Sequence, residues 1–375
     1  MVSLFEPPGP PDFRVDLSAL RHDGSWGEAL YACPQNPKWH AEGDVGTHTE
    51  MVCEALVADP RYRSLDESAR QVVWLAAVLH DVAKPRTTTR IDGEIRQPHH
   101  SRVGARLARR LLWEAGVPFA IREAACAIIR YHQVPFWLID QDDARGRAVR
   151  MSQSVRCDWL GLVARADAIG RTCDDQQWIV DQTELFEAFC AELGCLEAPW
   201  PFASDAARVR CGLDVQRDPL APGEPFPTFD VVLMSGLPAS GKSTWLSTHR
   251  PGWPVVSLDR LRHSMKIDPR GPQGRVVQAA KEAARVHLRA KQSFAWDATN
   301  LNADRRTPLI QMAVDYGARV HIVVCETPPA VLHSRNRSRE AVVPAKVIER
   351  MVDRWESPTW LEAHERTVVE SDALE

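Results

Sequence analysis

A glycine-rich segment at residues 236–244 contains the residues with the clearest potential for chemistry. Its sequence, GLPASGKST, fits the phosphate-binding pattern GxxxxGK[ST], and the apolar run 231–234 before it predicts a buried strand. In such a loop the backbone N–H groups cradle phosphates, the lysine reaches the β- and γ-phosphates, and a hydroxyl binds Mg²⁺. The pattern predicts a site for ATP or another nucleoside triphosphate with Mg²⁺, formed by Gly236, Ala239, Ser240, Gly241, Lys242, Ser243 and Thr244.

A candidate aspartate and a candidate arginine follow the next predicted strand, at 254–258. We expect this strand to neighbour the one before the glycine loop, so that Asp259 at its end faces the γ-phosphate. Asp259 could then accept the proton of an attacking hydroxyl. Arg262 lies on the same helix face and could hold a phosphate next to that hydroxyl. The alternative is an aspartate that caps the next helix, with a solvated arginine.

Three arginines at alternate positions, Arg335, Arg337 and Arg339, form a basic segment further along the chain. We interpret this segment as a lid that closes on the triphosphate, in which Arg335 and Arg339 stabilise the transferred charge. A solvated helix face is the alternative, although Glu340 is the one acidic neighbour that would neutralise the run. Asp297, at the end of another predicted strand, would line the same cleft and orient Mg²⁺-bound water or the lid.

A second set of candidates consists of histidines and aspartates from several predicted helices. The dipeptide His80-Asp81 ends one helix, and the others lie at the ends of further helices or within them. Imidazole and carboxylate ligands drawn from several helices suit Mn, Fe, Co, Ni or Zn, with water in the open positions. The candidate metal ligands are His48, His80, Asp81, His100, His132 and Asp167.

Lys84 accompanies this set. It follows Asp81 by three residues and His80 by four, so it shares their helix face and could hold a phosphate oxygen. His40, Glu42 and His99 are weaker candidates, for which a supporting role is as reasonable as a catalytic one. The alternative for the whole set is that its histidines cap helices or pack in a core.

Two halves of different fold class must position these residues. Helical periods run from Thr47, where Thr47 and Glu50 fit a capping box, to about Cys195, with segments at 48–58, 68–83, 102–115, 119–132, 154–170 and 176–193. Predicted strands at 231–235, 254–258, 293–297 and 319–325 then alternate with helices, which is typical of a parallel sheet. We predict an all-α domain over residues 1–205, a proline-rich linker over 206–228 and an α/β domain over 229–375.

The composition is that of a soluble globular protein in a reducing compartment. Apolar residues make up 44 % of the 375 residues and charged residues 26 %. The formal net charge of −4 means that a nucleic-acid partner would be held by local basic grooves. The nine cysteines show no CxxC pair and no metal-ligand spacing, which indicates free, mostly packed thiols. With no signal peptide or membrane span expected, the predicted location is cytoplasmic.

The histidine and aspartate set resembles a known superfamily. The run 33–49, with His40 and His48, followed by residues 79–85, resembles the HD phosphohydrolases, most of all the HD modules attached to bacterial tRNA nucleotidyltransferases. The resemblance implies core metal ligands at His48, His80, Asp81 and Asp167, and second-metal ligands at His100 and His132. Relatives often have paired histidines where this chain has His132-Gln133. The number of metals therefore stays open.

The glycine loop, the motif Ser257-x-Asp259-x-x-Arg262 and the three lid arginines together resemble the phage-type polynucleotide 5′-kinases. With the HD module in front, the order resembles the bifunctional bacterial HD-Pnk family from about Tyr31 onward. The resemblance implies phosphorylation of 5′-OH ends and removal of 2′,3′-cyclic, 2′- or 3′-phosphates, on single-stranded RNA or DNA ends. It also implies action alongside a nucleic-acid ligase, and it leaves open whether the protein is a homodimer.

Two other functions fit the residues alone. One is a nucleotide phosphohydrolase fused to a small-metabolite kinase, and the other is an HD sensor module that regulates an ATPase. Arg262 argues against the first, because it has a role if the acceptor carries a neighbouring phosphate. The complete ligand set with Lys84 argues against the second.

Overall fold

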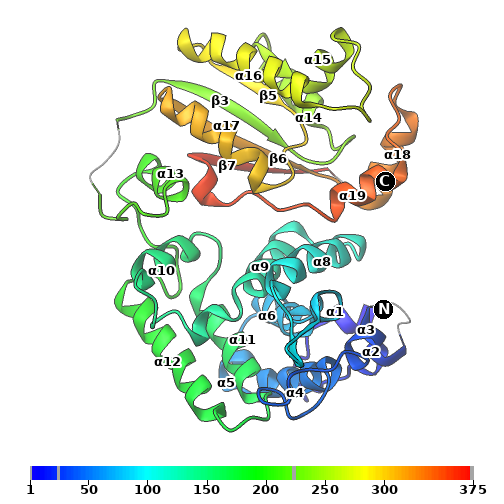
Figure 1. The fold of residues 1–375 in the computed structure, drawn as a ribbon, viewed down its shortest axis with the longest axis vertical. Coiled ribbons are helices and arrows are strands. Elements are labelled where there is room, and N and C mark those ends of the chain that lie inside the picture. Colours follow the sequence, from blue (N-terminus) through cyan, green and yellow to red (C-terminus); the bar gives the residue numbers. More distant parts are fainter. Residues whose placement is uncertain (1, 23–25, 222–224, 372–375) are drawn as a thin grey trace. The chain divides into compact units, whose positions relative to one another are not determined.

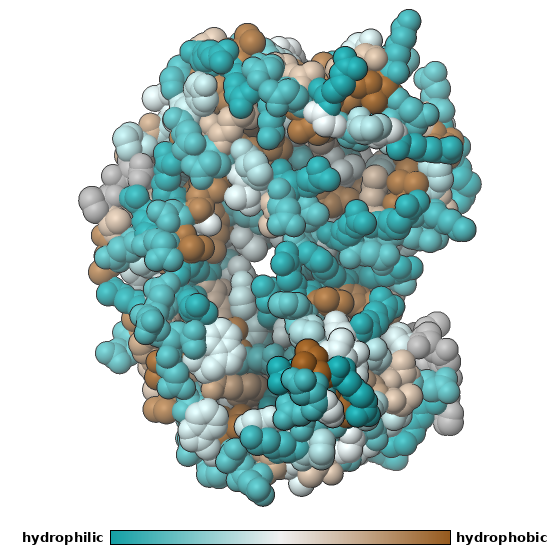
Figure 2. Space-filling model, in the orientation of Figure 1, coloured by the Kyte–Doolittle hydropathy of each residue, from teal (hydrophilic) through white to brown (hydrophobic). Residues whose placement is uncertain are grey.

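The structure is a computed structural model that describes residues 2–22, 26–221 and 225–371. The chain divides into two compact units, Met1–Pro201 and Phe202–Glu375 (Figure 1). The first unit is helical, and the second is built on a five-stranded parallel sheet. The predicted fold class is therefore confirmed. Figure 2 shows hydrophilic residues over most of the visible face of each unit, with only scattered apolar patches.

The helical unit surrounds one apolar core. Helices α4, α6, α9 and α11 contact one another, and their buried faces form most of this core. The elements of the unit are α1 (Val2–Phe5), α2 (Ser18–His22), α3 (Gly27–Tyr31), α4 (Val45–Ala58), α5 (Pro60–Ser64), α6 (Glu67–Leu79), α7 (Lys84–Thr87), β1 (Thr89–Ile91), β2 (Glu94–Arg96), α8 (His100–Glu114), α9 (Phe119–Tyr131), the 3-10 helix η1 (Val134–Phe136), α10 (Ala144–Ser152), α11 (Cys157–Ile169) and α12 (Gln176–Glu192).

The start of α4 differs from the predicted capping box. The helix begins at Val45, and the carboxylate of Asp44 accepts the N–H of Thr47 at 2.8 Å. A charged acceptor at this position also interacts favourably with the positive end of the helix. Glu50, the other member of the expected box, instead binds Arg21 and the hydroxyl of Tyr31.

The second unit contains the parallel sheet. Its strand order is β4-β5-β3-β6-β7, and every neighbouring pair is parallel. The elements are α13 (Asp205–Leu213), β3 (Phe229–Ser235), α14 (Lys242–His249), β4 (Val255–Ser257), α15 (Leu258–Ser264), α16 (Gly274–Arg289), β5 (Phe294–Asp297), α17 (Ala303–Asp315), β6 (Ala318–Glu326), α18 (Pro329–Ser338), α19 (Ala345–Val352), the 3-10 helix η2 (Trp360–Glu362) and β7 (Glu365–Glu370).

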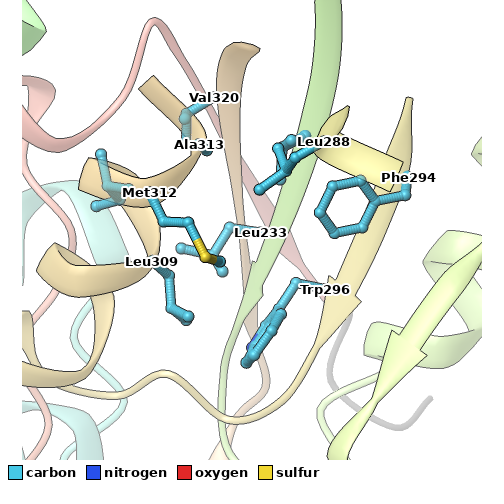
Figure 3. Close-up of a pocket in the computed structure, with 10 residues that line it drawn as sticks. Leu233, Leu288, Phe294, Trp296, Leu309, Met312, Ala313 and Val320 are labelled. Carbon is cyan, nitrogen blue, oxygen red and sulfur yellow. The ribbon is translucent and has the colours of Figure 1, made fainter. Parts of the chain in front are cut away.

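Helices cover both faces of this sheet. On one face, Val232 and Met234 of β3 pack against Trp245 of α14. On the other, Val231 and Leu233 lie towards α16 and α17, around the apolar pocket drawn in Figure 3. This pocket has a volume of about 10 Å³, which holds at most one water, and its lining is almost wholly apolar. It is therefore a small void in the core rather than a substrate site.

The segment predicted as a linker contains structure of its own. Its first part belongs to α13, which is capped by Ser204 and packs against η2. Arg208 of α13 donates to the carbonyl oxygen of Trp360 at 3.0 Å. The helix therefore belongs to the second unit, whereas the prediction treated residues from 206 onward as irregular.

Candidate functional sites

The six predicted metal ligands come together inside the helical unit, and all six are buried. His80 and Asp81 directly follow α6, where that helix ends at Leu79. The His80 ring centroid lies 5.4 Å from that of His48 and 5.3 Å from that of His132. His100, at the start of α8, has its ring 5.3 Å from that of His132. The first or last turns of five helices, or the residues directly beside them, thus bring these side chains together.

Asp81 lies at the centre of this cluster. Its Oδ2 is 3.1 Å from Nε2 of His80 and 3.9 Å from Nε2 of His48. Its Oδ1 is 3.4 Å from Nε2 of His100 and 3.9 Å from Nε2 of His132. One carboxylate therefore faces four imidazole nitrogens.

Backbone carbonyls fix the protonation of three of these rings. The Nδ1 atoms of His80, His100 and His132 lie 2.7 to 2.8 Å from carbonyl oxygens of residues three positions earlier. A carbonyl can only accept a hydrogen bond, so Nδ1 carries the proton and Nε2 of the neutral ring presents a lone pair. Burial also lowers the pKa of His132 to about 3, which keeps its imidazole neutral.

The cluster therefore fits a cation. Lone pairs of the Nε2 atoms converge on the Asp81 carboxylate, and three of the atoms involved have no hydrogen-bond partner in the described structure: His80 Nε2, Asp81 Oδ1 and His100 Nε2. Buried polar atoms of this kind are costly unless a partner is supplied. Burial lowers the pKa of His80, but the carboxylates of Asp81 and Asp167 outweigh it and raise that pKa above its usual value. Both features indicate a site that attracts positive charge.

Two groups of ligand atoms share Asp81. The first consists of His48, His80 and Asp81, and the second of Asp81, His100 and His132. Within each group the ligand atoms lie within 4.8 Å of one another. This arrangement offers two neighbouring metal positions bridged by one carboxylate. Occupation of one or both remains a prediction.

Charged partners hold the two aspartates. Arg171 binds Asp167 through two hydrogen bonds of 3.0 and 2.9 Å, and this carboxylate also lies 3.1 Å from Nε2 of His48. Lys84 is buried and donates to Asp81 at 2.6 Å and to Gln35 at 2.6 Å. Sequence reasoning gave no role to Arg171 or Gln35. In the sequence, the signal for Arg171 was its position four residues after Asp167, a spacing typical of paired side chains on a helix.

Glu42 contacts the cluster from outside. Its Oε1 lies 2.9 Å from Nδ1 of His48 and 2.8 Å from Nδ1 of His40. Its Oε2 accepts the backbone N–H of Thr172 at 2.9 Å. The carboxylate therefore fixes the proton of His48 on Nδ1, so that Nε2 faces Asp81 and Asp167. It also ties the segment before α4 to the one after α11.

We expect Glu42→Gln to weaken divalent-metal binding by about 10- to 100-fold, the usual effect of losing a carboxylate behind a ligating histidine. The measurement is metal affinity of the full chain by calorimetry. Glu54→Gln, an exposed change on α4, is the matched control. An unchanged affinity would show that Glu42 does not orient His48.

The glycine loop connects β3 to α14 in the second unit. Gly236 and Gly241 have φ values of 151° and 91°, which a residue with a side chain rarely adopts. A Cβ on Gly236 would also lie 2.5 Å from the carbonyl oxygen of Cys325. Gly241 is the residue before α14, so the positive end of that helix faces the loop. The loop has the form of a phosphate cradle.

Lys242 and Ser243 open α14 beneath this loop. Nζ of Lys242 donates to the carbonyl oxygens of Gly236 and Leu237 at 3.0 and 2.7 Å. Burial lowers the pKa of Lys242, while the carboxylate of Asp297 is the strongest influence that raises it. Ser243 Oγ lies 3.4 Å from Asp297 Oδ2. A hydroxyl and a carboxylate at this distance form a suitable pair for Mg²⁺.

The structure corrects the predicted position of Asp259. Its strand, β4, pairs with β5 and not with β3, so it does not neighbour the loop strand. The neighbour is β5, which ends in Asp297. The negative charge of Asp259 nevertheless acts to raise the pKa of both Lys242 and Asp297. Asp259 forms an ion pair with Arg262, whose Nε donates to Gln273 at 2.7 Å.

The arginine segment includes the last turn of α18. Arg335 lies in this helix and donates to Ser371 at 3.1 Å, and Arg339 directly follows the helix. The positive charge of Arg339 is among the influences that lower the pKa of Lys242. The predicted roles of Arg335 and Arg339 in charge stabilisation remain predictions.

Two protein families match parts of this chain. Residues 45–171 match the family described as HD domain, and residues 231–358 match the family described as AAA domain. The chain joins an HD domain to a P-loop domain. The HD match spans the metal-ligand cluster, and the other match spans the glycine loop, Asp259 and the arginine segment. The predicted combination of modules is confirmed.

Relatives cover parts of the chain. A Multifunctional CCA protein of Psychromonas ingrahamii is 29 % identical over 175 residues, which are 43 % of this chain and 38 % of the relative. That of Halorhodospira halophila is 36 % identical over 128 residues, 32 % of this chain and 28 % of the relative. The chain thus spans less than half the length of these curated relatives. Among solved structures, an unliganded sugar kinase of Janibacter is 18 % identical with a TM-score of 0.31, and the match covers 38 % of this chain and 86 % of that structure.

Among the described residues, no helix combines the length and apolarity that crossing a membrane requires.

Proposed function

We propose that this protein repairs broken nucleic-acid ends. Its P-loop domain phosphorylates 5′-hydroxyl ends with a nucleoside triphosphate, and its HD domain removes 2′,3′-cyclic, 2′- or 3′-phosphates. The observation that supports the acceptor assignment is the ion pair between Asp259 and Arg262, in the same unit as a glycine loop that fits a triphosphate. A base joined to a guanidinium suits a hydroxyl with a neighbouring phosphate.

In the kinase reaction, the acceptor hydroxyl attacks the γ-phosphate in line. The phosphate of the acceptor first replaces Asp259 as the partner of Arg262. Asp259 then accepts the proton of the attacking hydroxyl. Lys242 moves from the loop carbonyls to the phosphates, where its charge stabilises the transferred group. Arg335 and Arg339 close over the same group. Ser243 and Asp297 would hold Mg²⁺, which supplies charge neutralisation between the phosphates.

In the HD domain, the residues around Asp81 would hold one or two divalent transition metals, from among Mn, Co, Ni, Fe and Zn. The bound metal would supply activation of water and polarisation of the phosphoryl group. One N–H of Lys84 binds the carboxylate of Asp81, and a second binds the side-chain oxygen of Gln35. An ammonium group has three donors, so one remains for a phosphate oxygen. Arg171 and Glu42 fix the orientations of Asp167 and His48.

Both activities can be tested on one substrate. Full-length protein is incubated with a labelled RNA that carries a 5′-OH and a 2′,3′-cyclic phosphate, together with ATP, Mg²⁺ and Mn²⁺, Co²⁺ or Ni²⁺. We expect a phosphate gained at the 5′ end and lost at the other. Phosphorylation of a nucleoside as efficiently as a nucleoside 3′-monophosphate would instead favour a metabolite kinase. Metal-dependent release of phosphate from a generic ester would exclude a sensor role for the HD domain.

Arg262→Ala is expected to raise the KM for a nucleoside 3′-monophosphate by about 10-fold or more, because a hydrogen bond to a charged group contributes about 1.5–3 kcal/mol. The KM for ATP should change little. Steady-state kinetics with both substrates measure this, with the exposed Arg270→Ala as the matched control. A rise for ATP alone would assign Arg262 to the donor site and remove the support for a phosphorylated acceptor.

A further inference from the structure

Three cysteines meet in the HD unit, away from the ligands around Asp81. The sulfur atoms of Cys157, Cys190 and Cys195 lie within 4.8 Å of one another, and all three residues are buried. They come from the start of α11, the last turn of α12 and the segment after α12. No other cysteine in the described ranges belongs to a ligand group of this kind. The linear sequence showed no metal-ligand spacing, because the fold assembles the group from separate segments.

The end of α12 explains why two of the sulfurs meet. Gly194 has a φ of 74°, its N–H donates to the carbonyl oxygen of Ala191, and the N–H of Cys195 donates to that of Cys190 at 2.8 Å. This is a Schellman motif, in which the side chains at the positions of Cys190 and Cys195 contact each other. The carbonyls at the negative end of α12 are thereby capped.

The start of α11 contributes the third sulfur, together with the positive electrostatic potential of a helix start. Cys157 is the first residue of this 13-residue helix, and Arg156 before it provides no side-chain cap. The N–H of Asp158 donates to the carbonyl oxygen of Leu196 at 3.0 Å, which joins the helix start to the Cys195 segment. The positive end of a helix stabilises a thiolate.

Cysteine is often buried simply as a small apolar residue. Packing of that kind does not require three sulfurs at one point, nor a helix start directed at them. A zinc-class ion binds each sulfur at about 2.3 Å, which needs sulfurs about 4 Å apart. Sulfurs that all lie within 4.8 Å of one another are compatible with this spacing. Soft thiolate ligands select copper(I) and zinc over hard cations such as Mg²⁺.

We propose that Cys157, Cys190 and Cys195 bind a soft, thiophilic metal ion of the class of zinc(II) or copper(I). Binding releases the thiol protons to solvent as three sulfur–metal bonds form. Three sulfur ligands complete the coordination of copper(I), whereas zinc(II) takes a fourth ligand from outside this set. The ion joins the start of α11 to the end of α12, and α11 also carries Asp167. The bound ion therefore stabilises α11, the helix that supplies Asp167 to the ligand set around Asp81.

The test uses the full-length chain, stripped of metal under reducing conditions and reloaded with cobalt(II) as a probe for zinc or, separately, with copper(I). We expect a thiolate-to-metal charge-transfer absorption in at least one of the two arms, because the ligand set around Asp81 contains no sulfur. Cys195→Ser and Cys157→Ser should each lose the absorption and one bound metal per chain, counted by elemental analysis. Cys53→Ser, a buried cysteine on α4 outside the group, should keep both.

A wild-type measurement protects the test against variants that fold poorly. In the folded wild type, metal loading should protect three thiols from alkylation, identified by peptide mass spectrometry as the proposed residues. Absence of a thiolate band with both metals would overturn the proposal. So would a band that persists in the Cys157 and Cys195 variants, or protection of other cysteines.

Discussion

Lys242→Ala is expected to lower the rate of 5′ phosphorylation by about 10²–10³-fold or more, the effect of removing one donor that stabilises transition-state charge. Lys242 is partly buried and is held beneath the glycine loop by two carbonyl oxygens. Phosphoryl transfer depends mainly on such positioned charge, because the protein contributes little covalent chemistry. Transfer of labelled γ-phosphate to a 5′-OH oligonucleotide measures the rate.

Hydrolysis of phosphate ends should survive this change. The metal-ligand cluster lies in Met1–Pro201, and Lys242 lies in the other compact unit, which has its own core. Lys346→Ala, an exposed change on α19, is the control and should leave both activities unaltered. Loss of both activities in folded Lys242→Ala protein would mean that the two sites do not work independently.

The sequence indicated which elements carry the candidate residues better than it predicted how the strands are arranged. Residues such as His80 and Lys242 lie within local motifs whose chemistry fixes their spacing, so their elements could be placed from the linear pattern. The order β4-β5-β3-β6-β7 depends on pairing between strands far apart in the chain. Local periodicity does not contain that information, and the expected neighbour of β3 was therefore wrong.

Short or half-buried segments were also missed, for a related reason. Strand β7 (Glu365–Glu370) lies at the edge of the sheet and is only partly buried, so it lacks the continuous apolar run of β3. Helix α13 lies among prolines and glycines that favoured a linker, and tertiary contacts such as that of Arg208 stabilise it. The Glu42, Gln35 and Arg171 contacts likewise depend on side chains brought together only by the fold.

Asp81→Asn is expected to remove metal from the HD domain and to lower phosphate hydrolysis by about 10³-fold or more, a loss of about 4 kcal/mol of transition-state stabilisation. Asparagine keeps the shape of the side chain but not its charge. In the described part of the chain, Asp81 is the carboxylate that belongs to both groups of ligand atoms, so both metal positions lose their shared ligand. Elemental analysis of the purified chain and release of phosphate from a 3′-phosphorylated oligonucleotide measure the two effects.

Because Asp81→Asn removes the charged partner of Lys84, the folding of this variant must be checked. Removing one partner of a buried ion pair leaves the other uncompensated, which commonly costs about 3–5 kcal/mol. Lys84 retains Gln35 as an acceptor, and the cooperative thermal transition of the variant should be compared with that of Asp92→Asn, an exposed change in the turn between β1 and β2. His80→Ala, which leaves Asp81 and Lys84 paired, should also lose metal and hydrolysis. Kinase activity reports on the intact P-loop domain in the same samples. Full hydrolysis by folded Asp81→Asn protein without bound metal would show that the reaction does not use this cluster.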